Sequence, residues 1–113
     1  MPHIMITIGK TATPEQKDAL QAEIGGFMET IPGKNIGNTI INIVDGSFIY
    51  NNGARVEAAF ADVRLFQASP EDAKAAFCEK LYAAIEKNIG IPYNRVTVNF
   101  LELEHWGGGG GYR

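Results

Sequence analysis

Two segments of this chain, 56 positions apart, carry the same signal for the start of a helix. Thr13 and Ser69 each offer a hydroxyl side chain as an N-cap, a proline follows at the first helical position, and an acidic residue follows the proline. The strand-like segments after the two helices also match, since residues 41–43 (Ile-Asn-Ile) lie 57 positions before residues 98–100 (Val-Asn-Phe). The pattern predicts an internal repeat, with chance agreement between short amphipathic segments as the alternative.

Hydrophobic periodicity predicts four main strands and two helices. Apolar alternation or a run of β-branched residues marks strands at residues 3–8, 39–44, 56–66 and 95–102. Apolar residues at helical spacing mark helices from residue 13 to Pro32-Gly33 and from residue 69 to Gly90. Asn52-Gly53 is typical of a tight hairpin turn. Because a crossover helix joins parallel strands, the expected fold is α/β (α+β): two tandem β-α-β units, with four strands in one sheet and both helices on one face.

The length of 113 residues is that of one domain. We expect a single domain over residues 1–113, made of a first half with a short hairpin (1–53), a second half (54–106) and a glycine-rich tail (107–113). Consecutive glycines make that tail too flexible to order by itself, so it is expected to be either loose or docked on a neighbour.

Composition excludes several functional classes. With 45% hydrophobic residues and a net charge of -3, the chain indicates neither disorder nor affinity for nucleic acid. No apolar stretch approaches the roughly 20 residues of a membrane span, and the first residues do not resemble a secretion signal. Cys78 is the only cysteine, which favours a reducing compartment, so we expect a soluble, cytoplasmic protein.

Two helices cover only one face of such a sheet, and the composition of the second face is too apolar for exposure to water. Apolar and polar side chains share that face in a mixture suited to a buried surface: Met5, Ile40, Val44, Phe60 and Leu101 with Asn42, Asp62, Arg64, Thr97 and Asn99. The mixture predicts subunit contacts and a homo-oligomer. A solvated face with a few exposed hydrophobic residues is the alternative.

Signatures of cofactor chemistry are absent from the sequence. His3, Cys78 and His105 lack metal-ligand spacing, and the glycine run has no phosphate-binding lysine or following helix, so we expect no metal and no cofactor. Glu102, Glu104 and His105 form a polar cluster of a kind common at solvated strand ends. Cys78 lies beside the apolar stripe of a helix, which favours a packing role over a nucleophilic one.

Pro2 is the residue whose position creates chemistry. If Met1 is removed, the nitrogen of Pro2 changes from an amide into a secondary amine with a free lone pair. A model α-amino group titrates at about pH 8, and an apolar site or a nearby cation lowers that pKa. Such an amine can take a proton from a carbon next to a carbonyl group and return it elsewhere. The alternative is a proline that merely leads into an edge strand.

Several segments together resemble the macrophage migration inhibitory factor branch of the tautomerase superfamily. They are the opening MPHIMITIG, the helix start TPEQKDAL, the PGK turn, the long central strand and the ending NRVTVNFLELEHWGG, which span nearly the whole chain. The resemblance implies a homotrimer of β-α-β repeats, in which the amino-terminal proline lies in a pocket between adjacent subunits.

The resemblance also implies roles for individual residues. Pro2 would be the catalytic base, Lys34 in the PGK turn would bind the substrate carboxylate, and Asn99 would donate a hydrogen bond from the neighbouring subunit. The charge of Lys34 would also favour the deprotonated amine. An ordinary solvated lysine after a helix is the alternative for Lys34.

Two residues depart from the family pattern. Thr97 stands where the family usually has a pocket tyrosine, which leaves the packing of an aromatic substrate in question. Arg64 stands near the pocket, where an aliphatic residue is more usual, and it either binds a second carboxylate or pairs with Asp62. Trp106 either lines the pocket rim or packs on a subunit contact.

The function implied by the resemblance is that of a keto-enol tautomerase or isomerase of a small 2-oxo acid of the phenylpyruvate type. Lys34 or pocket amides would stabilise the enolate charge. Branches that decarboxylate or dehalogenate use paired arginines, and Arg64 has no second arginine close to it in the sequence. A trimeric cytokine-like or regulatory interaction protein with vestigial tautomerase activity is the alternative, and a ferredoxin-like ligand-binding module is a third hypothesis.

Overall fold

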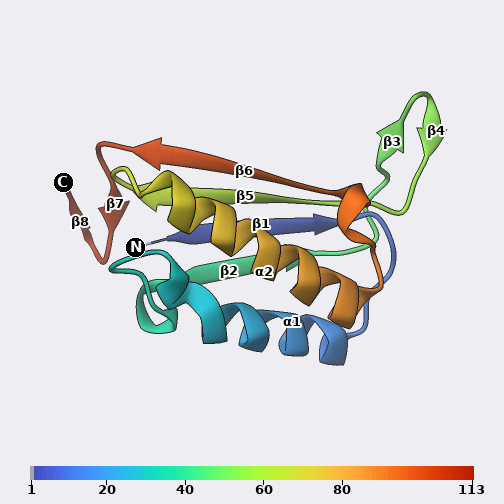
Figure 1. Ribbon diagram of the computed structural model, residues 1–113, viewed down its shortest axis with the longest axis horizontal. Helices are drawn as coiled ribbons and strands as arrows, with labels where there is room; N and C mark the ends of the chain where they lie inside the picture. Colours follow the sequence, from blue (N-terminus) through green and yellow to red (C-terminus); the bar gives the residue numbers. More distant parts are fainter. Residues whose placement is uncertain (1) are drawn as a thin grey trace.

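The computed structural model describes residues 2–113, so whether Met1 is removed lies outside the described residues. It confirms the predicted fold class: one four-stranded sheet carries both helices on the same face (Figure 1). The main elements, in chain order, are β1 (His3–Ile8), α1 (Pro14–Phe27), β2 (Ile40–Val44), β5 (Ala59–Phe66), α2 (Glu71–Ile89) and β6 (Val96–Leu103). Three short 3-10 helices connect them: η1 (Met28–Thr30), η2 (Ile36–Asn38) and η3 (Tyr93–Arg95).

The strand order is β2-β1-β5-β6, with each outer strand parallel to its inner neighbour, as the repeat predicts. The two inner strands are antiparallel, with His3 opposite Arg64 at one end and Ile8 opposite Ala59 at the other. The start of β1 and the carboxyl end of β5 therefore lie at the same end of the sheet.

The two helix starts match in sequence but differ in structure. Thr13 caps α1 as predicted, because its hydroxyl oxygen accepts the Gln16 N–H at 3.1 Å while the Gln16 side chain accepts the Thr13 N–H at 2.8 Å. At α2 the N-cap is Pro70, which has no side-chain cap. The Ser69 N–H instead donates to Glu102 Oε2 at 2.6 Å.

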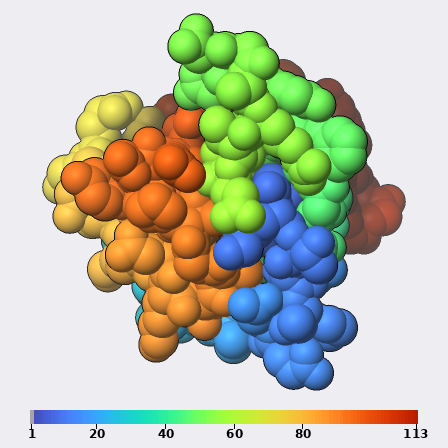
Figure 2. All heavy atoms as spheres, turned by 90° about the vertical axis from the view of Figure 1, so that its right-hand side faces the viewer, coloured from blue at the N-terminus to red at the C-terminus, as the bar shows by residue number. Residues whose placement is uncertain are grey.

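A small hairpin stands clear of the sheet at the end opposite the start of β1 (Figure 1; Figure 2 looks onto that end, where the hairpin is green). It consists of β3 (Tyr50–Asn51) and β4 (Ala54–Arg55). Asn52 and Gly53 have φ angles of 53° and 76°, as the predicted tight turn requires. The predicted start of the long strand at residue 56 is wrong. Residues 54–55 belong to β4 of the hairpin, and β5 begins at Ala59.

The glycine-rich tail also forms a hairpin, so the expectation of a loose tail is wrong, while docking on a neighbour stays a prediction. β7 (Gly107–Gly108) pairs with β8 (Gly111–Tyr112), and Trp106 and Arg113 exchange backbone hydrogen bonds of 2.7 and 3.0 Å. Gly109 and Gly110 turn the chain with φ angles of 59° and 82°, which glycine adopts without strain. This hairpin lies at the end of the sheet where β1 starts (Figure 1).

The hydrophobic core fills the layer between the sheet and the helices. Alternate residues of the inner strands point into it, and the predicted helix stripes meet them: Ile4, Ile6, Ile8, Ala61, Val63, Leu65, Leu20, Ile24, Phe77, Leu81, Ala84 and Ile85 are all 0% exposed. The opposite side chains of the strands form the uncovered second face, with the residues that the alternation predicts. Within residues 2–113, neither helix is long and apolar enough to cross a membrane.

Phe77 joins the two halves of the core. Its ring packs edge-on against Phe27 of α1 and Phe100 of β6, with centroids 5.4 and 6.2 Å away. Phe77→Ala should therefore lower the free energy of unfolding by about 3–5 kcal/mol in urea denaturation at fixed protein concentration. Tyr93→Ala is the control, because Tyr93 is 68% exposed. A loss below about 1 kcal/mol for Phe77→Ala would contradict this description of the core.

Candidate functional site

Pro2 is buried and lies directly before β1. Its carbonyl oxygen accepts the N–H of Ile40, the first residue of β2, at 2.9 Å. On the other side His3 pairs with Arg64, so Pro2 lies beside the carboxyl end of β5. The alternative of a proline leading into an edge strand is wrong, because β1 is an inner strand of the sheet.

Lys34 lies in the turn after α1, where Gly33 has a φ of 79° and the Lys34 N–H donates to the Ile31 carbonyl at 3.1 Å. Its half-buried side chain reaches β5, and Nζ donates to the Phe66 carbonyl at 3.4 Å. Among the ion pairs of residues 2–113, none involves Lys34. Pro2 and Lys34 thus both lie at the carboxyl end of β5, where the ammonium group can bind an anion.

Arg64 is exposed on the second face, between His3 of β1 and Leu101 of β6 in the strand register. No ion pair joins Arg64 to Asp62 in the described part of the chain. Of the two roles that the sequence leaves open for Arg64, pairing with Asp62 is therefore not formed, and carboxylate binding stays a prediction.

Asn99 and Thr97 are not brought to Pro2 within one chain. Asn99 lies opposite Asp62 and Thr97 opposite Phe60, both on β6. β5 separates β6 from β1, and the Asn99 side chain is exposed on the second face. These residues can reach a Pro2 pocket only from a neighbouring subunit.

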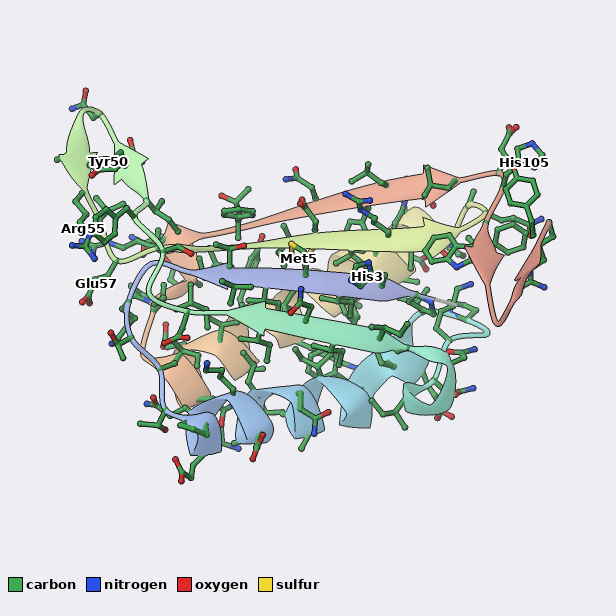
Figure 3. All side chains as sticks on the ribbon, turned by 180° about the vertical axis from the view of Figure 1, so that it is seen from behind. His3, Met5, Tyr50, Arg55, Glu57 and His105 are labelled. Carbon is green, nitrogen blue, oxygen red and sulfur yellow. The ribbon has the colours of Figure 1, made fainter. Side chains whose placement is uncertain are left out.

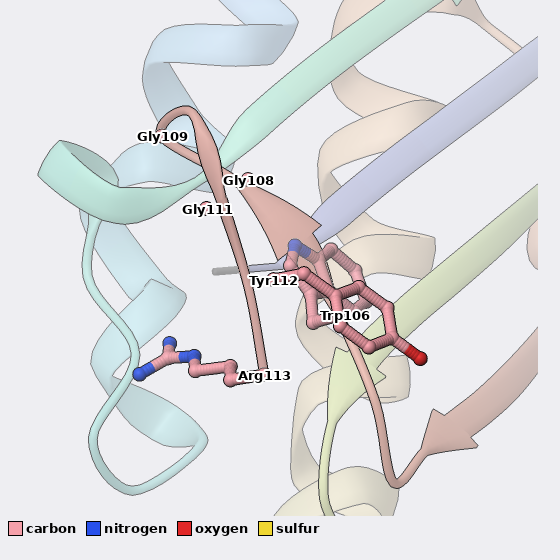
Figure 4. A pocket seen from close by; sticks show the side chains of 6 residues that line it. All are labelled: Trp106, Gly108, Gly109, Gly111, Tyr112 and Arg113. Atoms are coloured by element: carbon pink, nitrogen blue, oxygen red, sulfur yellow. The ribbon is translucent and has the colours of Figure 1, made fainter.

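The C-terminal hairpin places Trp106, which the sequence analysis singled out, beside Tyr112 and Arg113, which it did not. It encloses a hollow of about 310 Å³ whose lining does not include Pro2 or Lys34 (Figure 4): Trp106, Gly108, Gly109, Gly111, Tyr112 and Arg113. The Arg113 guanidinium carbon lies 4.5 Å from the centroid of the Phe66 ring. The Tyr112 ring stacks on His105 with centroids 6.0 Å apart. A glycine run carries no periodicity, so only the aromatic and charged residues that flank it could have signalled this contact.

Glu102, the first residue of the polar cluster at the end of β6, has a structural role. Lys74, only 7% exposed, donates from Nζ to Glu71 at 2.8 Å and to Glu102 at 2.9 Å. The bond from Lys74, followed by that from the Ser69 N–H, lowers the pKa of Glu102, and the bonds to Glu71 and Glu102 raise the pKa of Lys74. Glu102 is therefore held as a paired carboxylate, which ties β6 to the start of α2.

Cys78 is half-buried, and desolvation raises the pKa of its thiol, which disfavours a nucleophilic thiolate. Within residues 2–113, no three His, Cys, Asp or Glu side chains gather as a metal site.

No family model and no curated protein sequence matches the chain. Solved structures do match it. Leishmania major MIF2 is 22% identical with a TM-score of 0.91, covering 100% of this chain and 97% of that one. Native fused 4-OT is 15% identical with a TM-score of 0.84, covering 96% and 94%. A protein solved after inactivation by 2-oxo-3-pentynoate is 16% identical with a TM-score of 0.80, covering 89% and 85%. At these identities the likeness shows the fold, which is the one shared by the MIF-like and 4-OT members of the tautomerase superfamily.

Proposed function

We propose that this protein is a keto-enol tautomerase or isomerase of small 2-oxo acids, with Pro2 as its general base. The observation that carries the proposal is a buried Pro2 at the head of an inner strand, at the same end of β5 as Lys34. The fold likeness supports it, because one protein of this fold is inactivated by 2-oxo-3-pentynoate, itself a 2-oxo acid.

The reaction needs a base and an anion site. As an enol becomes a ketone, the substrate loses its hydroxyl proton and gains a proton at carbon 3. The Pro2 amine, once Met1 is removed, carries this proton, and the Lys34 ammonium holds the carboxylate beside the reacting carbons. Burial and the positive charge of Lys34 both disfavour a protonated Pro2, so activity should rise with pH as the amine loses its proton.

One chain supplies only part of such a site. Figure 3 shows His3 and Met5 on the second face of the sheet, which no helix covers. Large apolar side chains of that face are exposed, with Ile40 at 54%, Val44 at 43% and Leu101 at 40%. We propose a homotrimer in which a neighbour covers this face and brings its Asn99, with Thr97 in place of the family tyrosine, to Pro2.

Replacement of the base tests the function directly. Pro2→Gly keeps an amino terminus but loses the ring and the secondary amine, so kcat/KM for enol phenylpyruvate should fall about 100- to 10,000-fold. Ultraviolet absorbance of the enol follows the reaction, and intact mass establishes whether Met1 is gone. Wild-type turnover by a chain whose mass shows a blocked Pro2 would disprove the proline mechanism.

Removal of the carboxylate anchor should affect binding first. Lys34→Ala should raise KM for enol phenylpyruvate about 10- to 100-fold and lower kcat less, because the ion contact is present in both ground and transition states. Lys10→Ala is the matched control, since Lys10 follows β1 at the far end of the sheet. If Lys34→Ala leaves kcat/KM unchanged, Lys34 is not the anchor.

Sedimentation tests the assembly. We expect a particle of three chains of 12.3 kDa each at micromolar concentration. Val44→Glu places a charge on the second face, at the end of the sheet away from Pro2, and should lower the particle mass and the activity together. A fully active monomer would contradict both the trimer and the composite site.

A further inference from the structure

Phe66, the last residue of β5, is contacted by two cations that lie far apart in the sequence. Lys34 Nζ donates to the Phe66 carbonyl at 3.4 Å, and the Arg113 guanidinium lies 4.5 Å from the Phe66 ring centroid. Phe66 therefore links the proposed carboxylate anchor to a second cation, at the end of β5 beside which Pro2 lies.

The hydrogen-bonding edge of Arg113 is open to a ligand. Stacking on an aromatic ring uses the flat face of a guanidinium, while its N–H groups point outward in the plane. Within the described residues, the Arg113 side chain has no ion pair. Figure 4 shows it extending from β8 toward the segment between α1 and β2, away from the rings of Trp106 and Tyr112.

The hairpin fixes the position of this arginine. Arg113 exchanges two backbone hydrogen bonds with Trp106, of 2.7 and 3.0 Å, and Gly109-Gly110 closes the turn between them. A cation held in place by backbone pairing and ring stacking loses less conformational freedom when it binds an anion than a free arginine would.

We propose that Arg113 binds a second carboxylate of the substrate, so that the preferred substrates are 2-oxo dicarboxylic acids; this rests on the proposed function. Lys34 takes the carboxylate next to the 2-oxo group, and the guanidinium fork of Arg113 takes the distal one. Arg64 is the competing anchor, because it lies two residues before Phe66 on the same face of β5. Arg113 is favoured because it contacts the residue that also holds Lys34.

Kinetics on two substrates separate these roles. The enol of oxaloacetate carries a second carboxylate and the enol of phenylpyruvate does not. Arg113→Gln should lower the ratio of kcat/KM for the diacid to that for the monoacid about 10-fold or more, mainly through KM. Arg55→Gln is the matched control, since Arg55 stacks on Phe48 at 4.0 Å in the far hairpin (Figure 3) and should leave the ratio unchanged. An unchanged ratio in Arg113→Gln, or a larger fall in Arg64→Gln, overturns the proposal.

Binding gives a readout that does not depend on turnover. Trp106 is the only tryptophan and lies beside Arg113 in the hairpin. Its fluorescence should therefore report the binding of 2-oxoglutarate, a diacid, and of 2-oxobutyrate, a monoacid. Wild-type protein should bind the diacid about 10-fold more tightly, Arg113→Gln should lose that preference, and Arg113→Lys should keep part of it. If wild-type protein with a free Pro2 turns over neither enol yet shows this pattern, the tautomerase function fails and the diacid site stands. Equal binding of both acids by wild-type protein overturns the diacid site, whatever the turnover.

Discussion

The antiparallel pairing of β1 with β5 at the centre of the sheet is the constraint on which the rest of the structure depends. It joins the two β-α-β units, and it buries Ile4 and Ile6 beside Val63 and Ala61 under the helices. The same register places Pro2 beside the carboxyl end of β5. A one-residue slip would turn these core side chains to the second face, so the packing of the core also fixes the candidate site.

Much of the fold followed from local signals in the sequence. Thr13-Pro14 and the alternation of residues 3–8 set their elements at the predicted positions, because N-caps and two-residue periodicity act within a few residues. Ser69 looked like Thr13 but does not cap, because α2 begins at Glu71 and its N-cap position is occupied by Pro70. The order of the hairpin at residues 107–113 was also unpredictable, because it rests on tertiary contacts such as that of Arg113 with Phe66.

The candidate site was also predictable only in part, because its residues are brought together by tertiary contacts and by assembly. Pro2 was singled out from its position and Lys34 from a family resemblance, and the structure adds that both lie at the same end of β5. Arg113 was not singled out from the sequence, since no periodicity connects it with residue 66. Asn99 lies too far across the sheet to meet Pro2 in its own chain, so its role depends on assembly. Although the chain carries a net negative charge, Lys34, Arg64 and Arg113 all lie near the carboxyl end of β5, where their positive charges favour binding of an anion.

The central claim is that the Pro2 nitrogen is a free, reactive amine in a pocket for 2-oxo acids. Treatment with 2-oxo-3-pentynoate, followed by peptide mapping by mass spectrometry, tests it most directly. We expect one adduct per chain, on the Pro2 nitrogen, formed more slowly in Lys34→Ala and accompanied by loss of tautomerase activity. An adduct confined to Cys78, or complete inactivation with an unmodified Pro2, would contradict it.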